Sequence, residues 1–350
     1  MKQYDGLALF SGGLDSILAA RLLMEQSLRI LCLHFFSPFF GHPQKLAHWS
    51  SIYGLDIEPV DVSEEYVDML RNGPVYGFGS AMNPCVDCKI LMMRRARQLL
   101  GEYGTRFLVS GEVLGQRPMS QRRDTLNIIR RDAGVKGLLL RPLCARLLDP
   151  TEAEESGLVD RSRLLAINGR GRKEQLALAG HFGISEIPTP GGGCLLTEKE
   201  NTRQFWPVLR RLTRPCAADF RLAAVGRQFW HGDRWLSVGR SRFDNESYPP
   251  LLRPGDLLFK VAGFPGPLAL GRGSRPWDAE AVQEAAALMA SYSPKARQSG
   301  AEVSVRVTVD GETHCVSVLP RRETLFREPS WEEVSAELQI LHKQSGRRAE

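Results

Sequence analysis

The sequence lacks any long apolar run and any recognisable leader. No stretch of its 350 residues approaches the roughly 20 apolar residues that a membrane helix needs. The start, Met1 to Asp5, leads directly into a strand-like stretch without a charged and then apolar segment. With 43% hydrophobic and 25% charged residues, wholesale disorder is excluded as well. We therefore expect a folded cytoplasmic protein of two domains with no membrane partner. Nothing in the sequence indicates its oligomeric state.

The sequence also lacks an even number of cysteines. It has seven, so they cannot all pair in disulfides. An odd number in a reducing compartment argues for thiols or metal ligands rather than a disulfide framework. Four cysteines lie in apolar runs or beside prolines, and we expect them to be packing residues: Cys32, Cys144, Cys216 and Cys315. The three that remain are candidates for chemistry: Cys85, Cys88 and Cys194.

Strand and helix patterns alternate through the first half of the chain. This alternation predicts an α/β fold, a Rossmann-like parallel sheet covered by helices. The expected strands are 6–10, 29–36, 57–62, 106–110 and 138–140, and the expected helices are 14–26, 88–103, 151–156 and 172–182. The segment 188–194 is rich in proline and glycine and is expected to be irregular. We place the end of the first domain at residue 204.

The second half has a different pattern and predicts an α+β domain over 205–328. Short strands around Gly232 and Gly263 precede a helix at 278–291 and strands at 303–309 and 313–319. Residues 329–350 are expected to form a short helix and a polar tail.

A glycine loop follows the first expected strand and reads Ser11, Gly12, Gly13, Leu14, Asp15, Ser16. Free backbone N–H groups and serine hydroxyls at the start of a helix bind phosphate, and the glycines allow close approach. Asp15 cannot contact phosphate directly, so we expect it to hold a bridging Mg²⁺. The loop lacks a Walker-type lysine, which excludes a kinase-like phosphate loop.

These six residues resemble the signature of the PP-loop superfamily, the N-type ATP pyrophosphatases. The resemblance implies an adenine nucleotide alpha hydrolase-like domain that uses ATP and Mg²⁺, adenylates an oxygen and releases pyrophosphate. A later segment with Gly111, Glu112 and Gln116, followed by Arg141 and Pro142, resembles the second nucleotide motif of tRNA 4-thiouridine synthetases. These resemblances extend over about residues 5–200.

The segment from Asn83 to Lys89 resembles that of the tRNA 2-thiouridylases. By that resemblance Cys88 is a catalytic cysteine and Cys194 its sulfur-carrying partner. Cys85 stands where an aspartate is more usual and creates a third thiol. Three thiolates are the ligand set of cluster-dependent tRNA thiolases, so we expect a 4Fe-4S centre on Cys85, Cys88 and Cys194. A persulfide or disulfide pair without metal, and a structural zinc, remain alternatives.

Positive charge gathers in the second half. Residues 205–275 contain 12 Lys or Arg and 5 Asp or Glu, a net +7, whereas the rest of the chain sums to −1. Such a block favours a polyanionic partner. Ordered short motifs over 217–328 resemble the RNA-binding NFACT-R domain, with interleaved aromatics at Phe229, Trp230, Trp235 and Phe243 suited to base stacking unless they belong to the core. The residues expected to bind RNA are Arg227, Arg240, Arg242, Lys260 and Arg297.

Together these patterns predict an ATP-dependent tRNA sulfurtransferase. It would adenylate a uridine carbonyl oxygen and replace that oxygen with sulfur, which it would take from sulfide or a cysteine desulfurase. The expected catalytic residues are Asp15, Cys85, Cys88 and Cys194. Two alternatives stand beside this hypothesis: a non-catalytic factor that binds RNA or ribosomes, and a PP-loop synthetase that acts on a small molecule. The sequence does not indicate which uridine, or which of positions 2 and 4, would be modified.

Overall fold

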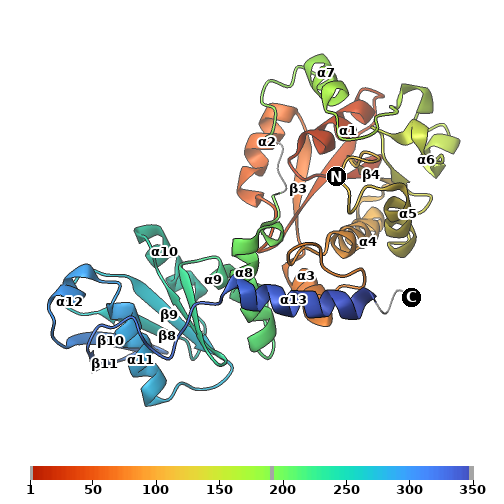
Figure 1. Ribbon diagram of the computed structural model, residues 1–350. Helices are drawn as coiled ribbons and strands as arrows, with labels where there is room; N and C mark the ends of the chain where they lie inside the picture. Colours follow the sequence, from red (N-terminus) through yellow and green to blue (C-terminus); the bar gives the residue numbers. More distant parts are fainter. Residues whose placement is uncertain (1–2, 190–192, 347–350) are drawn as a thin grey trace. The chain divides into compact units, whose positions relative to one another are not determined.

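The computed structural model describes residues 3–189 and 193–346, which form two compact units, Met1–Leu195 and Leu196–Glu350 (Figure 1). They are called the first and the second unit below. Of the glycine-rich segment expected to be irregular, residues 190–192 lie outside the described part. No helix among the described residues is long and apolar enough to cross a membrane.

The first unit is built on a five-stranded parallel sheet in the order β3-β2-β1-β4-β5. Its strands match the expected ones within two residues: β1 (Gly6–Leu9), β2 (Ile30–Phe36), β3 (Asp56–Asp61), β4 (Phe107–Ser110) and β5 (Leu139–Leu140). The central strand β1 and its neighbour β4 are buried along their whole length, as a sheet with helices on both faces requires. The expected Rossmann-like α/β fold is confirmed.

Alternate residues of β1 point to different cores. Ala8 packs in one core and Leu7 in the other, because successive side chains of a strand point to opposite faces. The helices whose residues join the core around Ala8 are α1 (Leu14–Met24), α2 (Leu46–Tyr53), α6 (Glu152–Glu155) and α7 (Lys173–His181). The core around Leu7 is covered by α4 (Cys85–Tyr103) and α5 (Arg123–Asp132), and α3 (Ser63–Asn72) contacts α4.

The second unit contains a six-stranded antiparallel sheet in the order β11-β10-β8-β9-β7-β6. Helix α11 (Ala279–Ala290) packs on it through a run of buried alanines and Leu288. The strands are β6 (Arg227–His231), β7 (Arg234–Val238), β8 (Leu257–Val261), β9 (Leu268–Gly273), β10 (Val303–Val309) and β11 (Glu312–Val318). The expected α+β architecture is confirmed.

The remaining helices of the second unit are α8 (Lys199–Arg211), α9 (Ala217–Ala223), α10 (Arg242–Ser247), α12 (Pro294–Gln298) and α13 (Trp331–Gly346). The domain boundary expected at residue 204 falls inside α8. This helix belongs with the second unit because Phe205 and Trp206 are buried there. Trp206 Nε1 also donates a hydrogen bond to Glu337 on α13 at 2.8 Å, which ties the C-terminal helix to α8.

The four cysteines expected to be packing residues differ in how far they are buried. Cys32 and Cys144 are buried as expected, and Cys216 is half-buried at the start of α9. Cys315 is exposed, so the packing role expected for it is wrong. The reason is its register in β11, where it lies opposite the exposed Arg306 on the solvated face of the sheet.

Candidate active site

The glycine loop lies beside the loop after β4. At this point the order of strands in the first sheet reverses, because β2 and β3 lie on one side of β1 and β4 and β5 on the other. The strands β1 and β4 are neighbours in the sheet, although they are far apart in the chain. In a doubly wound sheet, ligands bind outside the carboxyl ends of the strands at such a switch point. The two loops are in contact. Gly111 packs so closely against the backbone of Asp15 that a Cβ at position 111 would lie only 2.5 Å from the Asp15 carbonyl oxygen.

The glycine loop is arranged as an anion site. Gly12 has a φ of +76° and lies against the ring of Trp49, where a Cβ would come within 2.7 Å. The hydroxyl of Ser16 donates to the carbonyl of Gly13 at 2.7 Å, and the Ser11 hydroxyl accepts from the N–H of Gly13 at 3.3 Å. No side chain caps the start of α1. Its first turn therefore keeps donors available for an anion.

Asp15 is held within this loop by a residue from the loop after β4. Gln116 Nε2 donates to Asp15 Oδ2 at 3.1 Å. Burial raises the pKa of the Asp15 carboxyl, while the Gln116 hydrogen bond and the charges of Arg172 and Arg117 act in the opposite direction. Two of the expected nucleotide-site residues, Asp15 and Gln116, are thus in direct contact, with two cationic side chains near them.

Glu112 is buried in the loop after β4, beside Arg141 and Lys89. Its side chain is 2% exposed, accepts a hydrogen bond from Arg141 Nε at 3.0 Å and lies 3.9 Å from Lys89 Nζ. Burial alone would raise the pKa of Glu112, but Arg141 and Lys89 outweigh it and lower the pKa. Oε2 is thus paired with Arg141, whereas the buried Oε1 has no hydrogen-bond partner among the described residues. The nucleotide contact expected for Glu112 stays a prediction.

The thiols gather around Tyr66 of α3. Cys85 and Cys88 lie in the first turn of α4, and the Cys88 thiol shares a hydrogen bond with the buried Tyr66 hydroxyl. Burial raises the pKa of Tyr66, and so does the nearness of Cys88, Cys194 and Cys85. Asn83 Nδ2 also donates to Cys85 Sγ at 3.1 Å. All three cysteines singled out in the sequence are therefore neighbours of one phenol.

The chain at Cys194 is held near Tyr66 by a hydrogen bond of the next residue, Leu195. The N–H of Leu195 donates to the carbonyl of Phe39 at 2.8 Å, and the ring of Phe39 lies 5.5 Å from that of Tyr66. The other neighbour, Gly193, lies near His42. His42 in turn is close to Trp49, the residue that covers Gly12, with 6.5 Å between the ring centroids. The segment at 193–195 thus lies beside the thiols, and His42 and Trp49 stand between it and the glycine loop.

The arrangement of the thiols does not amount to a metal site. Among residues 3–189 and 193–346, no group of three or more His, Cys, Asp or Glu side chains is placed to hold a metal ion. Burial also raises the pKa of the Cys88 thiol to about 11, which favours the protonated form at neutral pH. A metal ion displaces the proton of a thiol that coordinates it, so this raised pKa does not decide between thiol and metal chemistry. The expected 4Fe-4S centre and the alternative zinc stay predictions.

Comparison with known proteins agrees with the nucleotide loop. Residues 1–147 match the family model described as "Thiamine biosynthesis protein (ThiI)". These residues form a ThiI-family domain. The predicted kinship with PP-loop tRNA thiolation enzymes is confirmed, whereas the NFACT-R resemblance lies outside the matched residues and stays a prediction.

Curated relatives of the ThiI-family domain are tRNA sulfurtransferases by name. The chain is 29% identical over 115 residues to the probable tRNA sulfurtransferase of Thermococcus kodakarensis, covering 31% of this chain and 30% of that protein. It is 32% identical over 158 residues to that of Finegoldia magna, covering 43% and 38%. It is 30% identical over 176 residues to the tRNA sulfurtransferase of Shewanella frigidimarina, covering 47% and 32%. The chain spans about a third of the length of these relatives.

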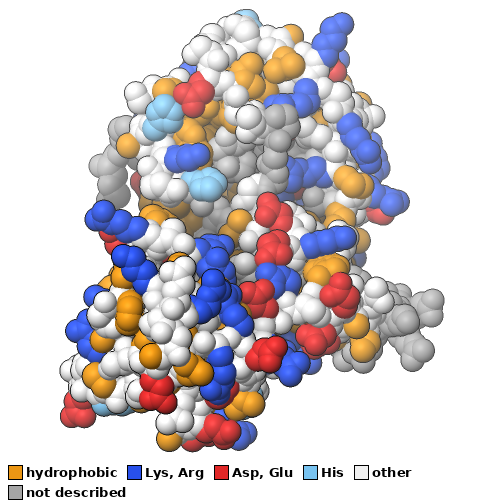
Figure 2. Space-filling model, turned by 60° about the vertical axis from the view of Figure 1, so that its left-hand side comes forward, with side chains coloured by type: hydrophobic (Ala, Val, Ile, Leu, Met, Phe, Trp, Pro, Cys, Tyr) orange, Lys and Arg blue, Asp and Glu red, His pale blue; other side chains and the backbone are white. Residues whose placement is uncertain are grey.

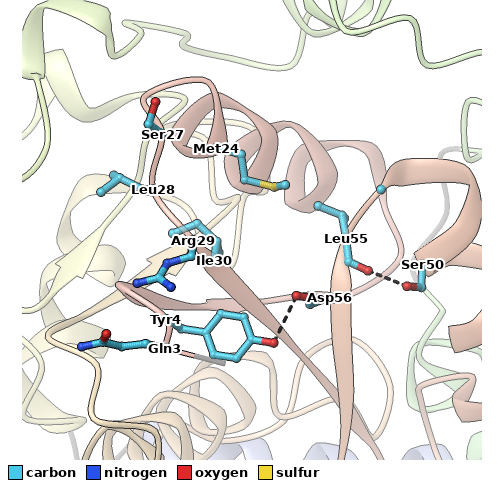
Figure 3. Close-up of a pocket in the computed structure, with 11 residues that line it drawn as sticks. Gln3, Tyr4, Met24, Ser27, Leu28, Arg29, Ile30, Ser50, Leu55 and Asp56 are labelled. Carbon is cyan, nitrogen blue, oxygen red and sulfur yellow. Dashed lines mark hydrogen bonds between the residues drawn. The ribbon is translucent and has the colours of Figure 1, made fainter. Parts of the chain in front are cut away.

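A hollow of about 740 Å³ lies elsewhere on the ThiI-family domain (Figure 3). It is lined by the residues at which β2 and β3 begin and by Tyr4, whose hydroxyl donates to Asp56 at 3.1 Å. The amino ends of parallel strands form the edge opposite to the one that carries the glycine loop. This hollow therefore does not belong to the candidate active site.

Several residues near the site carried no clear signal in the sequence. Trp49, Arg117, Arg172 and Gln175 lie around the glycine loop although none belongs to a quoted motif. One signal was present for Arg172 and Gln175. They stand at the start of an expected helix, and in a doubly wound sheet the helices that follow parallel strands begin near the same edge.

Outside the ThiI-family domain, the residues expected to bind RNA lie at the surface of the second unit. Arg240, Arg242, Lys260 and Arg297 are exposed and Arg227 is half-buried. Basic side chains also occur over much of the molecular face in Figure 2, with acidic ones among them. Lys260 of β8 is directly opposite the exposed Arg306 of β10. Like charges opposite each other destabilise a sheet, so this pair favours an anionic partner.

Part of the basic block is internal. Arg272 is 5% exposed and binds Asp219 at 3.0 Å and Asp256 at 2.5 Å, and Arg253 also pairs with Asp219 at 2.9 Å. The aromatics are mostly internal too. Phe229, Trp230 and Trp235 are buried, so base stacking by these three is excluded, whereas Phe243 is 76% exposed.

Proposed function

We propose that this chain is an ATP-dependent tRNA sulfurtransferase that thiolates a uridine. The observation that carries the proposal is the meeting of the glycine loop and the three thiols at one edge of the first sheet. Two contacts link the segment that carries Cys85 and Cys88 to the loop after β4, which touches the glycine loop. Lys89, next to Cys88, approaches Glu112 at 3.9 Å, and Asn83, which binds Cys85, lies 3.7 Å from the sulfur of Met119 in the loop that carries Gln116. The names of the relatives support the choice of tRNA.

In the proposed reaction the glycine loop, Ser11 to Ser16, holds the phosphates of ATP and Asp15 holds Mg²⁺. The metal, when bound, would neutralise phosphate charge. The uridine carbonyl oxygen attacks the α-phosphate and pyrophosphate leaves. Sulfur then attacks the activated carbon, and AMP departs with the former carbonyl oxygen. Adenylation is needed because a carbonyl oxygen is otherwise a poor leaving group.

Sulfur delivery is assigned to the thiols themselves. One cysteine attacks the outer sulfur of the persulfide carried by a cysteine desulfurase, which leaves as its thiol, and the new persulfide attacks the carbon through its own outer sulfur. A second cysteine then attacks the inner sulfur, which releases the thiolated base and leaves a disulfide for an external thiol to reduce. No step is assigned to a 4Fe-4S centre, because the described thiols do not present a metal site.

Exchange of pyrophosphate into ATP, measured with and without tRNA, tests the enzyme assignment. We expect exchange that depends on tRNA and is lost in Asp15→Asn. The control Glu102→Gln removes an exposed carboxylate at the far end of α4 and should retain exchange. No exchange in the wild type would favour the non-catalytic RNA-binding factor, and exchange indifferent to tRNA would favour the small-molecule synthetase.

Mass spectrometry of tRNA nucleosides tests sulfur transfer. We expect thiouridine from the wild type and from Cys315→Ser, and none from Cys88→Ser or Cys194→Ser, the two cysteines to which the resemblance gives roles in sulfur transfer. Iron and acid-labile sulfide should be measured on anaerobically purified protein. Stoichiometric iron that disappears in Cys85→Ser would overturn the assignment of sulfur delivery to thiols alone.

A further inference from the structure

The helices α1 and α7 run side by side in the first unit (Figure 1). Their carboxyl ends are joined by His181 of α7, whose Nε2 lies 2.7 Å from Oε1 of Glu25 at the end of α1. Ala179 of α7 packs in the same core as α1. The first turn of α7, which contains Gln175, therefore lies at the same edge of the sheet as the first turn of α1, which contains Asp15.

The entry to α7 is fixed against the loop that carries Gln116. The N–H of Gly169 donates to the carbonyl of Leu114 at 2.8 Å, and Asn168 pairs with Leu114 as an isolated bridge. Gln116 itself is bonded to Asp15. Three segments distant in sequence thus supply one polar side chain each to the same place: Asp15, Gln116 and Gln175.

Each of these side chains has a buried oxygen without a partner. Asp15 Oδ1, Gln116 Oε1 and Gln175 Oε1 have no hydrogen-bond partner within the part of the chain that the structure describes. The Gln175 side chain lies close enough to the Asp15 carboxylate to lower its pKa by hydrogen bonding. Gln175 is completely buried, at 0% exposure. Leaving a buried polar group unpaired is costly, and native proteins leave few such groups without a reason. The group is therefore suited to a ligand.

We propose that Gln175 completes a site for a hard divalent cation, Mg²⁺ or Mn²⁺, together with Asp15 and Gln116. This inference rests on the proposed function, which places Mg²⁺ at Asp15, and adds the two amides as ligands. Carboxylate and amide oxygens are the donors that hard cations prefer. One carboxylate and two neutral amides leave positive charge on the cation for phosphate oxygens.

The neighbouring cations determine how tightly the metal alone is held. Arg117 and Arg172 both act electrostatically on Asp15. They oppose a bare divalent cation and favour a phosphate. The site should consequently bind the metal weakly by itself and more tightly together with a nucleotide.

The test is to titrate the full chain with Mn²⁺, with and without a non-hydrolysable ATP analogue. The electron paramagnetic resonance signal of free Mn²⁺ measures how much of the metal is bound. In the presence of the analogue we expect Gln175→Leu to weaken Mn²⁺ binding at least tenfold. Gln175→Glu, which keeps an oxygen ligand and adds charge, should bind Mn²⁺ as tightly as the wild type or more tightly. The exposed neighbour Glu174→Gln is the matched control and should bind like the wild type.

Unchanged Mn²⁺ affinity in Gln175→Leu would overturn the inference, and so would weaker binding by Gln175→Glu than by the wild type. The second variant keeps the test decisive if Gln175→Leu does not fold, as judged by circular dichroism. Equilibrium dialysis of the labelled analogue separates the two proposals. A wild type that binds no nucleotide contradicts the proposed function, whereas nucleotide binding with Mn²⁺ affinity indifferent to Gln175 contradicts this inference alone.

Discussion

Arg141 Nε donates a hydrogen bond to Glu112 Oε2 at 3.0 Å, and the two side chains are 3% and 2% exposed. The pair joins the end of β4 to the segment after β5. Substitution Glu112→Gln should lower the free energy of unfolding by about 3–5 kcal/mol, because it leaves the buried guanidinium without a counter-charge. Urea denaturation followed by far-UV circular dichroism measures the change. Asp149→Asn, which removes an exposed partner of Arg130, should cost less than about 1 kcal/mol.

The same pair predicts how stability changes in acid. Arg141 and Lys89 lower the pKa of Glu112 in the folded protein, so the unfolded chain takes up this proton first as the pH falls. The pair contributes its full stability above the ordinary glutamate pKa of 4.5 and loses that contribution below it. The difference in unfolding free energy between wild type and Glu112→Gln should therefore be constant from about pH 5.5 to 8, within about 0.5 kcal/mol, and shrink at lower pH. A difference that grows toward acid pH would contradict the assigned direction.

Gly12 can be tested through both its backbone and its neighbour. Gly12→Ala should destabilise the protein by about 1–3 kcal/mol, because φ is +76° and the new Cβ would come within 2.7 Å of the Trp49 ring. Adding Trp49→Leu should recover part of the loss, since it relieves the clash and leaves the backbone strain. Chemical denaturation of both variants measures this. Gly101→Ala, at a helical position with nothing near its Cβ, is the control and should be neutral or stabilising.

The buried ion pairs of the second unit predict a separate stability effect. Arg272→Met should destabilise this unit by about 3–5 kcal/mol, because Asp256 loses its buried counter-charge and Asp219 loses one of its two arginine partners. Tryptophan fluorescence is a suitable probe, since five of the six tryptophans belong to this unit: Trp206, Trp230, Trp235, Trp277 and Trp331. Arg275→Met removes an arginine that is 82% exposed and should change stability by less than about 0.5 kcal/mol.

The like-charged pair Lys260 and Arg306 gives a test of RNA binding. Changing both to Gln should weaken tRNA binding and reduce the slope of log affinity against log salt by about 0.7–0.9 for each phosphate that is no longer neutralised. Stability should stay the same or rise, because repulsion across the strands is removed. Fluorescence anisotropy with labelled tRNA at several salt concentrations measures both effects. Arg29→Gln, at the amino edge of the first sheet, is the control, and an equal loss of affinity there would argue against a specific surface.

Much of the first unit could be predicted because its signals are local. The strand at Gly6 and the glycines at 12 and 13 determine the backbone of the loop from short-range pattern alone. The helix starting at Leu14 follows from the same pattern. Gln175 could not be assigned in this way, since its role depends on three segments that meet only in the folded sheet. The ion pair of Glu112 could not be predicted for a similar reason, because its partner Arg141 lies 29 residues further on.

The second unit shows where charge and aromatic content mislead. Arg272 counts toward a basic block in the sequence, yet burial and two aspartates remove it from the surface. Trp230 and Trp235 stack on each other with 5.1 Å between their ring centroids, and both are buried. Strand alternation could not have sorted these aromatics, because the neighbours Phe229 and Trp230 are both buried on β6 and the exposed Phe243 lies in the helix α10.

The hydrogen bond between Leu195 and Phe39 joins the last residue of the first unit to a segment near its beginning. As the chain is synthesised, the glycine loop and the pair Cys85 and Cys88 are made well before Cys194. A nascent chain that has not yet reached Leu195 would already contain the proposed means of activating an oxygen without the complete set of thiols. During translation, the residues proposed to activate the oxygen are thus made first. The residues proposed to transfer sulfur are complete only when the last residues of the same domain have been added.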